Sequence, residues 1–291
     1  MPPMQSGNRS RIAFIGGGGM ARALIAGLLR RGVAPRQISV GEPSPDARTA
    51  LQRELGIDAV SADNAAAAAG ADLVVLAVKP QDAGTALAGL RPALLEREAV
   101  VLSIAAGLRL ADLARACPPP IALVRAMPNR PALLGAGVTA LFAAPSVTAA
   151  QRALADLVGA ASGRAVWLRA ESELDIVTAL SGSGPAYFFL LAEHMARAAQ
   201  DLGLEPDIAA LLAADTLYGA GLLAHQGTPL SEQRAAVTSS GGTTEAALRA
   251  FQQGGFDALV ARALQAASAR SSQLADMLST TPDSLHTSKR P

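Results

Sequence analysis

The pattern of apolar and polar positions divides the chain into two halves. Between residues 11 and 168, short runs rich in β-branched residues alternate with Ala/Leu-rich segments of helical period, which is typical of βαβ units around a parallel sheet. After Trp167, apolar residues recur at spacings of three and four, which indicates helices throughout. The pattern therefore predicts an α/β domain with a parallel sheet over residues 1–168 and an all-α domain over residues 169–278.

The individual elements follow from the same periodicity. Strands are expected at residues 12–15, 38–41, 73–78, 100–103, 121–125, 138–142 and 165–168. Helices are expected between them at 20–31, 45–55, 81–90, 110–116 and 147–159, with a short helix in the Ala-rich run 65–69. Further helices are expected at 171–179, 185–202, 206–225, 230–237, 243–253 and 256–277. The polar, Ser/Thr-rich segment 279–291 is expected to be a disordered tail.

Composition and charge exclude several classes of protein. Half of the residues are apolar but only 3% are aromatic, so Ala, Leu and Val must fill the core. The 25 Lys and Arg residues are balanced by 24 Asp and Glu residues, which leaves no basic surface for nucleic acid. A single cysteine, Cys117, and three histidines far apart in sequence predict neither a disulfide framework nor a metal site.

No membrane segment is expected from the sequence. The residues before the first strand lack the apolar core of a secretory signal. The longest uncharged stretch, 176–192, contains Ser, Gly and Pro and is too short and polar for a bilayer span. We therefore expect a cytoplasmic protein that binds neither nucleic acid nor membranes.

A glycine-rich turn follows the first expected strand. The strand IAFIG leads directly into Gly16, Gly17, Gly18, Gly19, Met20 and Ala21 and then into an Ala/Leu-rich helix, which is the dinucleotide fingerprint in its strand-turn-helix setting. Gly16 permits the tight turn, Gly18 lets a pyrophosphate approach the main chain, and Ala21 permits close helix-strand packing. The free N–H groups and the helix dipole would hold the phosphates. All six residues are expected to bind the cofactor.

The end of the second expected strand carries opposing signals about the cofactor. Glu42 stands where an acidic residue can bind the adenine ribose and repel a 2′-phosphate, which favours NAD. Ser44 and Arg48 follow within reach of a 2′-phosphate and favour NADP. An alternative role for Arg48 is a solvated charge on a helix. The residues alone leave the choice open as NAD(P).

Two further segments, 77–80 and 104–106, lie at the ends of expected strands on the carboxyl edge of the sheet. Doubly wound folds bind ligands at this edge. Lys79 would lie there beside the ribose or nicotinamide, or else be a solvated strand cap. Asn64 could reach the adenine side of the cofactor, or else be a simple helix N-cap. Cofactor-binding residues are therefore also expected at Asn64, Ala77, Val78, Lys79, Pro80, Ile104, Ala105 and Ala106.

Two glycine- and hydroxyl-rich stretches interrupt the helical half, at residues 180–187 and 237–244. Each precedes an expected helix and so offers free N–H groups together with hydroxyls, which suit a small carboxylate. Each stretch by itself is also explained as a Ser/Thr-capped helix start.

Together with the fingerprint, these stretches resemble the pyrroline-5-carboxylate reductase family from Ile12 to about Leu274. The matching motifs are IAFIGGGGMARAL, the pair Asp63-Asn64, AVKPQ, SIAAG, VRAMPNRPALLGAGVTAL, TALSGSGPAY, VTSSGGTTEAAL and GGFDALV. The resemblance implies NADPH- or NADH-dependent reduction of 1-pyrroline-5-carboxylate to proline. It also implies a Rossmann-like, dinucleotide-binding domain followed by an all-α dimerisation domain. The helical domains would interleave in a homodimer, which can assemble into a larger ring such as a decamer.

The resemblance also implies roles for residues in the second loop. The Thr244 hydroxyl would lie against the ring nitrogen as the catalytic group, and the substrate-binding set would be Ser239, Gly241, Gly242, Thr243 and Thr244. The chain departs from the family at Gly19, where Asn is common, and at Arg130, where Thr is usual. No His, Asp or Glu lies within either loop, so protonation of the ring nitrogen is expected from solvent.

Two other classes remain as alternatives. A β-hydroxyacid dehydrogenase would need a catalytic Lys on the helix at 185–202, which contains none. A regulator that senses NAD(P) without turnover would keep the fingerprint but would not need the hydroxyl-rich loop at 237–244. Oxidation of NAD(P)H by pyrroline-5-carboxylate separates all three classes.

Overall fold

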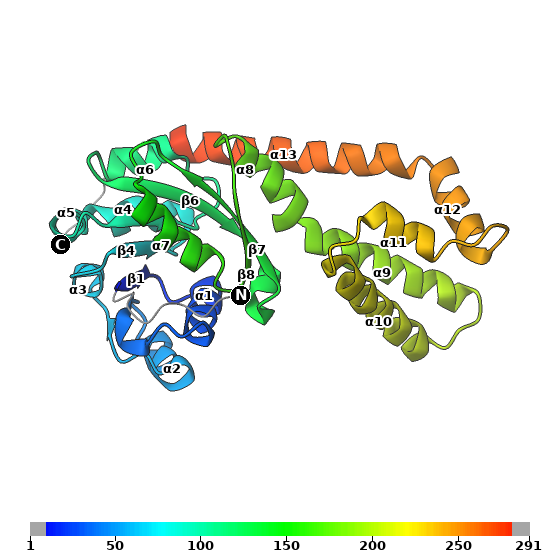
Figure 1. Cartoon of the computed structure of the whole chain (residues 1–291), viewed down its shortest axis with the longest axis horizontal. Coiled ribbons are helices and arrows are strands. Elements are labelled where there is room, and N and C mark those ends of the chain that lie inside the picture. The colour runs from blue at the N-terminus through cyan, green and yellow to red at the C-terminus, as the bar shows by residue number, and fades with distance from the viewer. Residues whose placement is uncertain (1–9, 281–291) are drawn as a thin grey trace. The chain divides into compact units, whose positions relative to one another are not determined.

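The computed structural model describes residues 10–280, and these form two compact units. The first unit contains the described chain up to Gly182 together with the part that follows Ala267, and the second unit is Ser183–Ala267 (Figure 1). Segments 169–182 and 268–280 group with the first unit because they bond to each other and to its sheet, as where Ser271 Oγ donates to Asp175 Oδ1 at 2.7 Å. The expected domain boundary at residue 168 stays a prediction.

The first unit is built on an eight-stranded sheet in the order β3-β2-β1-β4-β5-β6-β7-β8. The strands are β1 (Ile12–Ile15), β2 (Ile38–Gly41), β3 (Val60–Ser61), β4 (Leu73–Leu76), β5 (Val100–Ser103), β6 (Ala122–Pro128), β7 (Gly137–Ala143) and β8 (Gly163–Trp167). Because β1 lies between β2 and β4, the order of the strands reverses at β1. Ligands of doubly wound folds bind outside the carboxyl ends of the strands at such a point.

Helices cover both faces of this sheet. They are α1 (Gly19–Arg30), α2 (Pro45–Leu55), α3 (Asn64–Ala68), α4 (Ala83–Ala88), α5 (Arg91–Glu96), α6 (Leu110–Ala116), α7 (Ala149–Gly159) and α8 (Glu173–Val177). Alternate residues of each strand point to opposite faces. Phe14 packs with α1, α2 and α7 in one apolar cluster, and Ile15 packs with α3, α4, α5 and α6 in the other (Figure 1).

The structure corrects several expected elements. The sheet is not wholly parallel, because β6 and β7 pair antiparallel. The connection between them is the short 3₁₀ turn η3 (Arg130–Leu134), which is too short for the crossover that parallel neighbours require. The helix expected at 81–90 is divided into the 3₁₀ turn η2 (Pro80–Asp82), α4 and α5, and the strand expected at 73–78 ends at Leu76. The strand β3 was not expected.

The second unit is helical, as expected. The π-helical turn η4 (Thr178–Gly182) leads into α9 (Gly184–Asp201), which is followed by α10 (Pro206–His225), α11 (Leu230–Ala236), α12 (Thr243–Gln253) and α13 (Phe256–Thr280). All of residues 183–267 are described, and only Gly184 and Ala209 among them are buried. The helix α13 continues to Thr280, so the tail expected from residue 279 is wrong for its first two residues. The rest of that tail, 281–291, lies outside the described residues.

Two helical stretches of the described chain, 173–201 and Pro206–His225, are long and apolar enough to cross a membrane by length and composition alone. This differs from the expectation based on residues 176–192, because α8, η4 and α9 join into one longer helical stretch. Helices that bury a face against another protein have the same composition. The two stretches therefore do not by themselves indicate a membrane protein.

Candidate active site

The turn between β1 and α1 has the shape of a phosphate cradle. Gly16 has φ +100°, and a Cβ there would lie 2.6 Å from the carbonyl oxygen of Ala77. A Cβ on Gly17 would lie 2.7 Å from Leu51, whereas Gly18 and Gly19 face open space. No described side chain caps the N-terminus of α1. The first two glycines are thus required by close packing, and the next two leave room for a phosphate beside the uncapped helix end, so these residues fit a dinucleotide.

Arg22, which the sequence argument did not single out, holds this turn in place. Its Nε donates to Gly17 O at 3.0 Å, and its guanidinium also contacts Ala47 O and forms an ion pair with Glu54 at 2.8 Å. The side chain therefore ties the cradle to α2. Its position one residue after the fingerprint carries no recognised signal, because the pattern describes only the backbone turn. Of the two residues before it, Met20 is half-buried and Ala21 is buried against the sheet.

Glu42 lies beside the cradle with its carboxylate bound by backbone amides. Its Oε2 accepts from Gly17 N–H at 2.9 Å and its Oε1 from Ser44 N–H at 2.9 Å. The Ser44 hydroxyl caps α2. Arg48 donates from Nη1 to the carbonyl oxygens of Glu42 and Pro43 at 2.7 and 2.8 Å. Arg48 is therefore a half-buried, bonded residue rather than a fully solvated charge, and all three expected side chains gather at the end of β2.

Asn64 lies at the same end of β2 but does not cap α3. The N-cap is Asp63, whose side chain accepts from Ala65 N–H at 2.9 Å. The Oδ1 atom of Asn64 lies so close to Gly41 that a Cβ on Gly41 would come within 2.5 Å of it. The capping alternative for Asn64 is therefore wrong, and its amide lies against Gly41 at the end of β2.

The segments after β4 and β5 come together at the carboxyl edge of the sheet. Ala77 N–H donates to Ile15 O at 2.8 Å, and Ile104 N–H donates to Leu76 O at 3.1 Å, so both segments continue the pairing of their strands. Among the expected cofactor residues here, Lys79 and Ala106 are exposed, Ala105 is buried, and the half-buried ones are Ala77, Val78, Pro80 and Ile104. The structure brings all of them to the edge that also carries the glycine-rich turn.

Asn129 is a second residue that the sequence argument missed, although it lies within the VRAMPNRPALLGAGVTAL motif. It is 8% exposed. Its Nδ2 donates to Ser181 O at 3.1 Å, and its Oδ1 accepts from Val138 N–H at 2.9 Å. The side chain thereby fixes the π-helical turn η4, and such turns are frequent at functional sites. The neighbouring Arg130 is exposed.

In the second unit, the loop before α12 is arranged around an uncapped helix N-terminus. Gly242 is the N-cap residue, no described side chain caps the helix, and Thr244 lies half-buried in its first turn. Gly242 N–H donates to Ser239 O at 3.0 Å, and a Cβ on Gly242 would collide with Ser239 Oγ. Gly241 has φ +71°, which favours glycine. The loop backbone thus turns its first-turn N–H groups outward.

One of these loop amides already binds a carboxylate from the chain itself. Glu245 Oε2 accepts from Gly241 N–H at 2.8 Å. The sequence argument missed Glu245, although a glutamate three residues after an N-cap is the usual position for reaching back to such an amide. The amides of Gly241 and Gly242 therefore have partners within the loop. The assignment of Ser239, Gly241, Gly242, Thr243 and Thr244 to a substrate stays a prediction.

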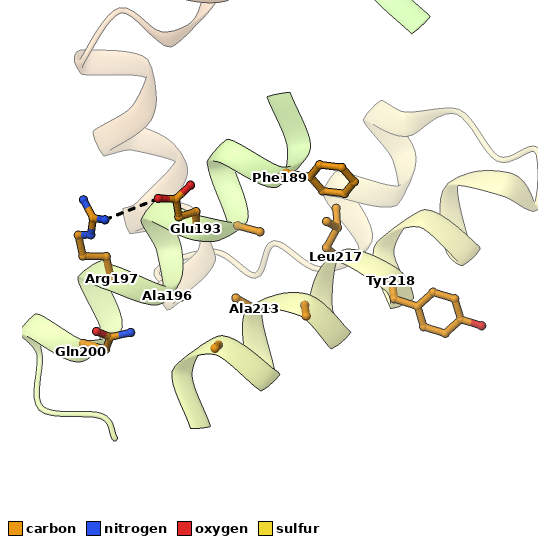
Figure 2. A pocket seen from close by; sticks show the side chains of 11 residues that line it. Phe189, Glu193, Ala196, Arg197, Gln200, Ala213, Leu217 and Tyr218 are labelled. Atoms are coloured by element: carbon orange, nitrogen blue, oxygen red, sulfur yellow. Dashed lines mark ion pairs between the residues drawn. The ribbon is translucent and has the colours of Figure 1, made fainter. Parts of the chain in front are cut away.

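The second unit also contains a groove between α9 and α10 of about 710 Å³. Figure 2 shows small alanine side chains along it, with Phe189, Leu217 and Tyr218 at one end and the Glu193–Arg197 ion pair at 3.6 Å on its α9 side. None of the expected site residues lines this groove. The groove is therefore not part of the candidate active site.

The doubly wound sheet and its glycine-rich cradle define an NAD(P)-dependent oxidoreductase. Residues 11–107 match the family described as NADP oxidoreductase coenzyme F420-dependent, and residues 171–274 match the family described as pyrroline-5-carboxylate reductase dimerisation. The chain is 47% identical to the pyrroline-5-carboxylate reductase of Pseudomonas aeruginosa over 269 residues, which are 92% of this chain and 98% of the relative. The chain belongs to the pyrroline-5-carboxylate reductase family, and the expected resemblance is confirmed.

Other relatives agree. The pyrroline-5-carboxylate reductase of Mycobacterium tuberculosis strain H37Rv is 41% identical over 91% of this chain and 97% of its own. The solved structure of the Coxiella burnetii pyrroline-5-carboxylate reductase superimposes with a TM-score of 0.88 at 38% identity, covering 92% of this chain and 99% of that one. A Plasmodium falciparum pyrroline carboxylate reductase, solved with NADP bound, has a TM-score of 0.76 at 25% identity over 91% of this chain and 98% of its own.

Proposed function

We propose that this chain reduces 1-pyrroline-5-carboxylate to proline, the last step of proline biosynthesis, with NADPH or NADH as the reductant. The observation that carries the proposal is 47% identity to a pyrroline-5-carboxylate reductase over 92% of the chain, together with a glycine cradle that fits a dinucleotide. The bound dinucleotide supplies the hydride for C5 of the cyclic imine. The chain itself must bind, orient and polarise the two partners.

The first unit holds the cofactor. The free first-turn N–H groups of α1 bind the pyrophosphate, and Gly18 and Gly19 leave room for it. Glu42, Ser44, Arg48 and Asn64 border the adenosine half. The segments 77–80 and 104–106 line the carboxyl edge and border the nicotinamide half. The departure from Asn at Gly19 removes one side-chain contact and leaves this backbone cradle intact.

The second unit holds the substrate through its loop 239–244. The first-turn N–H groups of α12 bind the carboxylate of the substrate, because an uncapped helix N-terminus attracts an anion. The contact of Glu245 with Gly241 N–H supports this role, since that amide already donates to a carboxylate oxygen. Ser239, Gly241 and Gly242 shape the turn, and the backbone of Thr243 contributes an N–H group.

Thr244 is the catalytic residue in this proposal. Its hydroxyl hydrogen-bonds the ring nitrogen as the charge there changes during reduction, and solvent provides the proton. With no stronger acid in the loop, most of the rate enhancement comes from proximity and orientation. Tight fixation of the carboxylate by backbone amides supplies that orientation.

The chain works as a homodimer with interleaved helical domains, and a larger ring such as a decamer can form from these dimers. Support comes from the match of residues 171–274 to a dimerisation family and from the exposed apolar side chains on α9 and α10. In this view, the alanine-lined groove of Figure 2 receives a helix of the second copy. A cytoplasmic location also belongs to this proposal.

The test follows the absorbance of NADPH or NADH when 1-pyrroline-5-carboxylate is added to the purified protein. We expect oxidation of the cofactor and formation of proline. The matched control is 1-pyrroline, which has the same imine without the carboxylate and should react far more slowly because the loop amides have nothing to bind. A protein that binds the cofactor but oxidises neither NADPH nor NADH with the carboxylated imine would contradict the proposal.

A further inference from the structure

The loop at residues 104–109 follows β5 and is held at both of its ends. At its start, Ala105 N–H donates to Ser103 Oγ at 3.3 Å. At its end, Arg109 N–H donates to Asp112 Oδ2 at 3.0 Å, and Leu110 N–H donates to Glu171 Oε1 at 2.7 Å. These bonds restrict a segment that the proposed function places beside the nicotinamide.

Asp112 is the centre of this arrangement, and part of its support comes from the far end of the chain. Its carboxylate is 6% exposed, so each of its hydrogen-bond donors matters. Besides Arg109 N–H, it accepts from the Arg115 guanidinium and from Ser279 Oγ, the latter at 2.9 Å from Oδ2. Ser279 lies in the last turn of α13, 167 residues further along the chain than Asp112.

The same turn of α13 packs directly on the loop. Gly107 has φ +80°, and a Cβ on it would lie 3.0 Å from Leu278 Cδ1. Leu278 also packs against the apolar cluster of α4, α5 and α6 and lines a small cavity together with Pro80. An ion pair at 2.7 Å joins Arg109 to Asp276 on the surface. The last turn of α13 therefore contacts the loop 104–109 directly and lines a cavity with Pro80 of the segment 77–80.

Stabilisation of the fold alone does not explain which residues the last turn of α13 contacts. The surface pair Arg109–Asp276 contributes little stability, because both side chains are partly solvated. The contacts of Ser279 and Leu278 instead fall on Asp112 and Gly107, the residues that determine the path of the loop. Ser271, one of the other serines on α13, bonds to Asp175 in α8 and touches neither residue.

We infer that Leu278 and Ser279 are positioning residues for the cofactor. They hold the loop 104–109 in the conformation that receives the nicotinamide half of the dinucleotide. This inference rests on the proposed function for the identity of the ligand. It goes further by assigning a role in cofactor affinity to the last turn of α13.

The experiment titrates the purified full-length protein with NADPH alone and follows the fluorescence of the cofactor. Ser279→Ala and Leu278→Ala are expected to weaken binding about threefold to tenfold, because the loop is no longer held in the receiving conformation. Ser279→Thr keeps the hydroxyl and should restore affinity. Ser271→Ala is the matched control on the same helix and should bind NADPH as the wild type does. In steady state, the KM for NADPH should rise while kcat stays unchanged.

Unchanged NADPH affinity in both Ser279→Ala and Leu278→Ala would overturn the inference, even if their melting temperatures fell. An equal loss of affinity in Ser271→Ala would also overturn it, because the effect would then belong to the helix in general. Because the titration needs no second substrate, its result does not depend on turnover of 1-pyrroline-5-carboxylate. A failure of this inference is therefore distinct from a failure of the proposed reaction.

Discussion

In the first unit, most large apolar side chains are shielded from solvent, whereas many in the second unit are not. Phe14 and Leu24 in the first unit are 0% and 1% exposed. Phe188 and Phe189 in the second unit are 59% and 60% exposed, and Tyr218 is 69% exposed. Exposed apolar surface on this scale marks an interaction site in ordinary proteins.

From this difference we expect the two units to be stabilised by different routes. The central strands of the first unit are buried on both faces under its own helices, so this unit has its own core. The helices of the second unit have no comparable core within the chain, and they coincide with the dimerisation match at residues 171–274. The cofactor site is thus expected to be complete in one chain, while the proposed substrate loop is expected to depend on a second copy of the helical unit.

The largest expected effect comes from a substitution in the second unit that should lower turnover without changing cofactor binding by the first unit. Thr244→Ala should lower kcat/KM by roughly tenfold to a thousandfold, about 1.4 to 4 kcal/mol of transition-state stabilisation. Cofactor affinity should barely change, because the cradle belongs to the first unit. Steady-state kinetics with a parallel melting curve measure both quantities.

The controls for this prediction are two neighbouring changes. Thr244→Ser keeps the hydroxyl and should retain most of the activity, and Thr243→Ala should be milder because only its backbone N–H is needed. Normal turnover of Thr244→Ala together with a lower melting temperature would show that Thr244 is only a first-turn helix residue.

A charge placed on the exposed apolar surface of the second unit should break the dimer. Phe189→Arg puts an unpaired charge at one end of the groove in Figure 2 and should reduce activity roughly tenfold to a hundredfold at micromolar protein. NADPH binding should persist. Leu95→Arg is the matched control, because Leu95 in α5 of the first unit is 41% exposed. Sedimentation that shows an intact, active Phe189→Arg dimer would remove this surface from the interface.

The cofactor preference tests the first unit by itself. Glu42→Ser removes a carboxylate from the position of a 2′-phosphate, so the ratio of kcat/KM for NADPH to that for NADH should rise about fivefold to tenfold. Because Glu42 also binds Gly17 N–H, some loss of affinity for both cofactors is expected. An unchanged ratio would mean that Glu42 only braces the turn and does not face the ribose.

The smallest effect concerns the closed core of the first unit. Burial raises the pKa of the Cys117 thiol to about 11, and the charge of Arg91 offsets part of that rise. At pH 8 only about one thiol in a thousand is ionised, so iodoacetamide should modify the native protein very slowly and the unfolded protein rapidly. Mass spectrometry gives both rates, and rapid labelling of the native protein would show that this core is open.

The same shift predicts a pH dependence of stability. The unfolded thiol ionises near its ordinary value of 9.0, whereas the folded thiol stays protonated up to about 11. The stabilisation from this group is therefore present below pH 9 and is lost as the pH rises from about 9 to about 11. Chemical unfolding at several pH values measures this decrease in the free energy of unfolding. Cys117→Ala should remove the part of the decrease between about pH 9 and about pH 11 that comes from the thiol.

The sequence predicts the regular parts of the fold because their signals are local. The glycine turn, the buried strands and the helices of the second half follow from periodicity and from turn chemistry. The two-residue strand β3 is too short to produce a period. The antiparallel pairing of β6 with β7 depends on the length of one connection, which a strand pattern does not encode.

The parts of the candidate site that were missed depend on tertiary contacts. Arg22, Asn129 and Ser279 act through partners 32, 52 and 167 residues away, and no local pattern reports such pairs. Ser279 begins a polar, Ser/Thr-rich segment and was therefore assigned to the tail. Glu245 carries a local signal, since it follows the N-cap at the reach-back spacing, but the resemblance implies roles only for the hydroxyls and amides beside it.

The most direct test of the central claim is the specific activity measured from micromolar to nanomolar protein, with sedimentation velocity on the same samples. Activity is predicted to fall in step with the fraction of dimer, while NADPH binding per chain stays constant, because only the second unit needs its partner. A monomer that retains full activity at nanomolar concentration would contradict the claim.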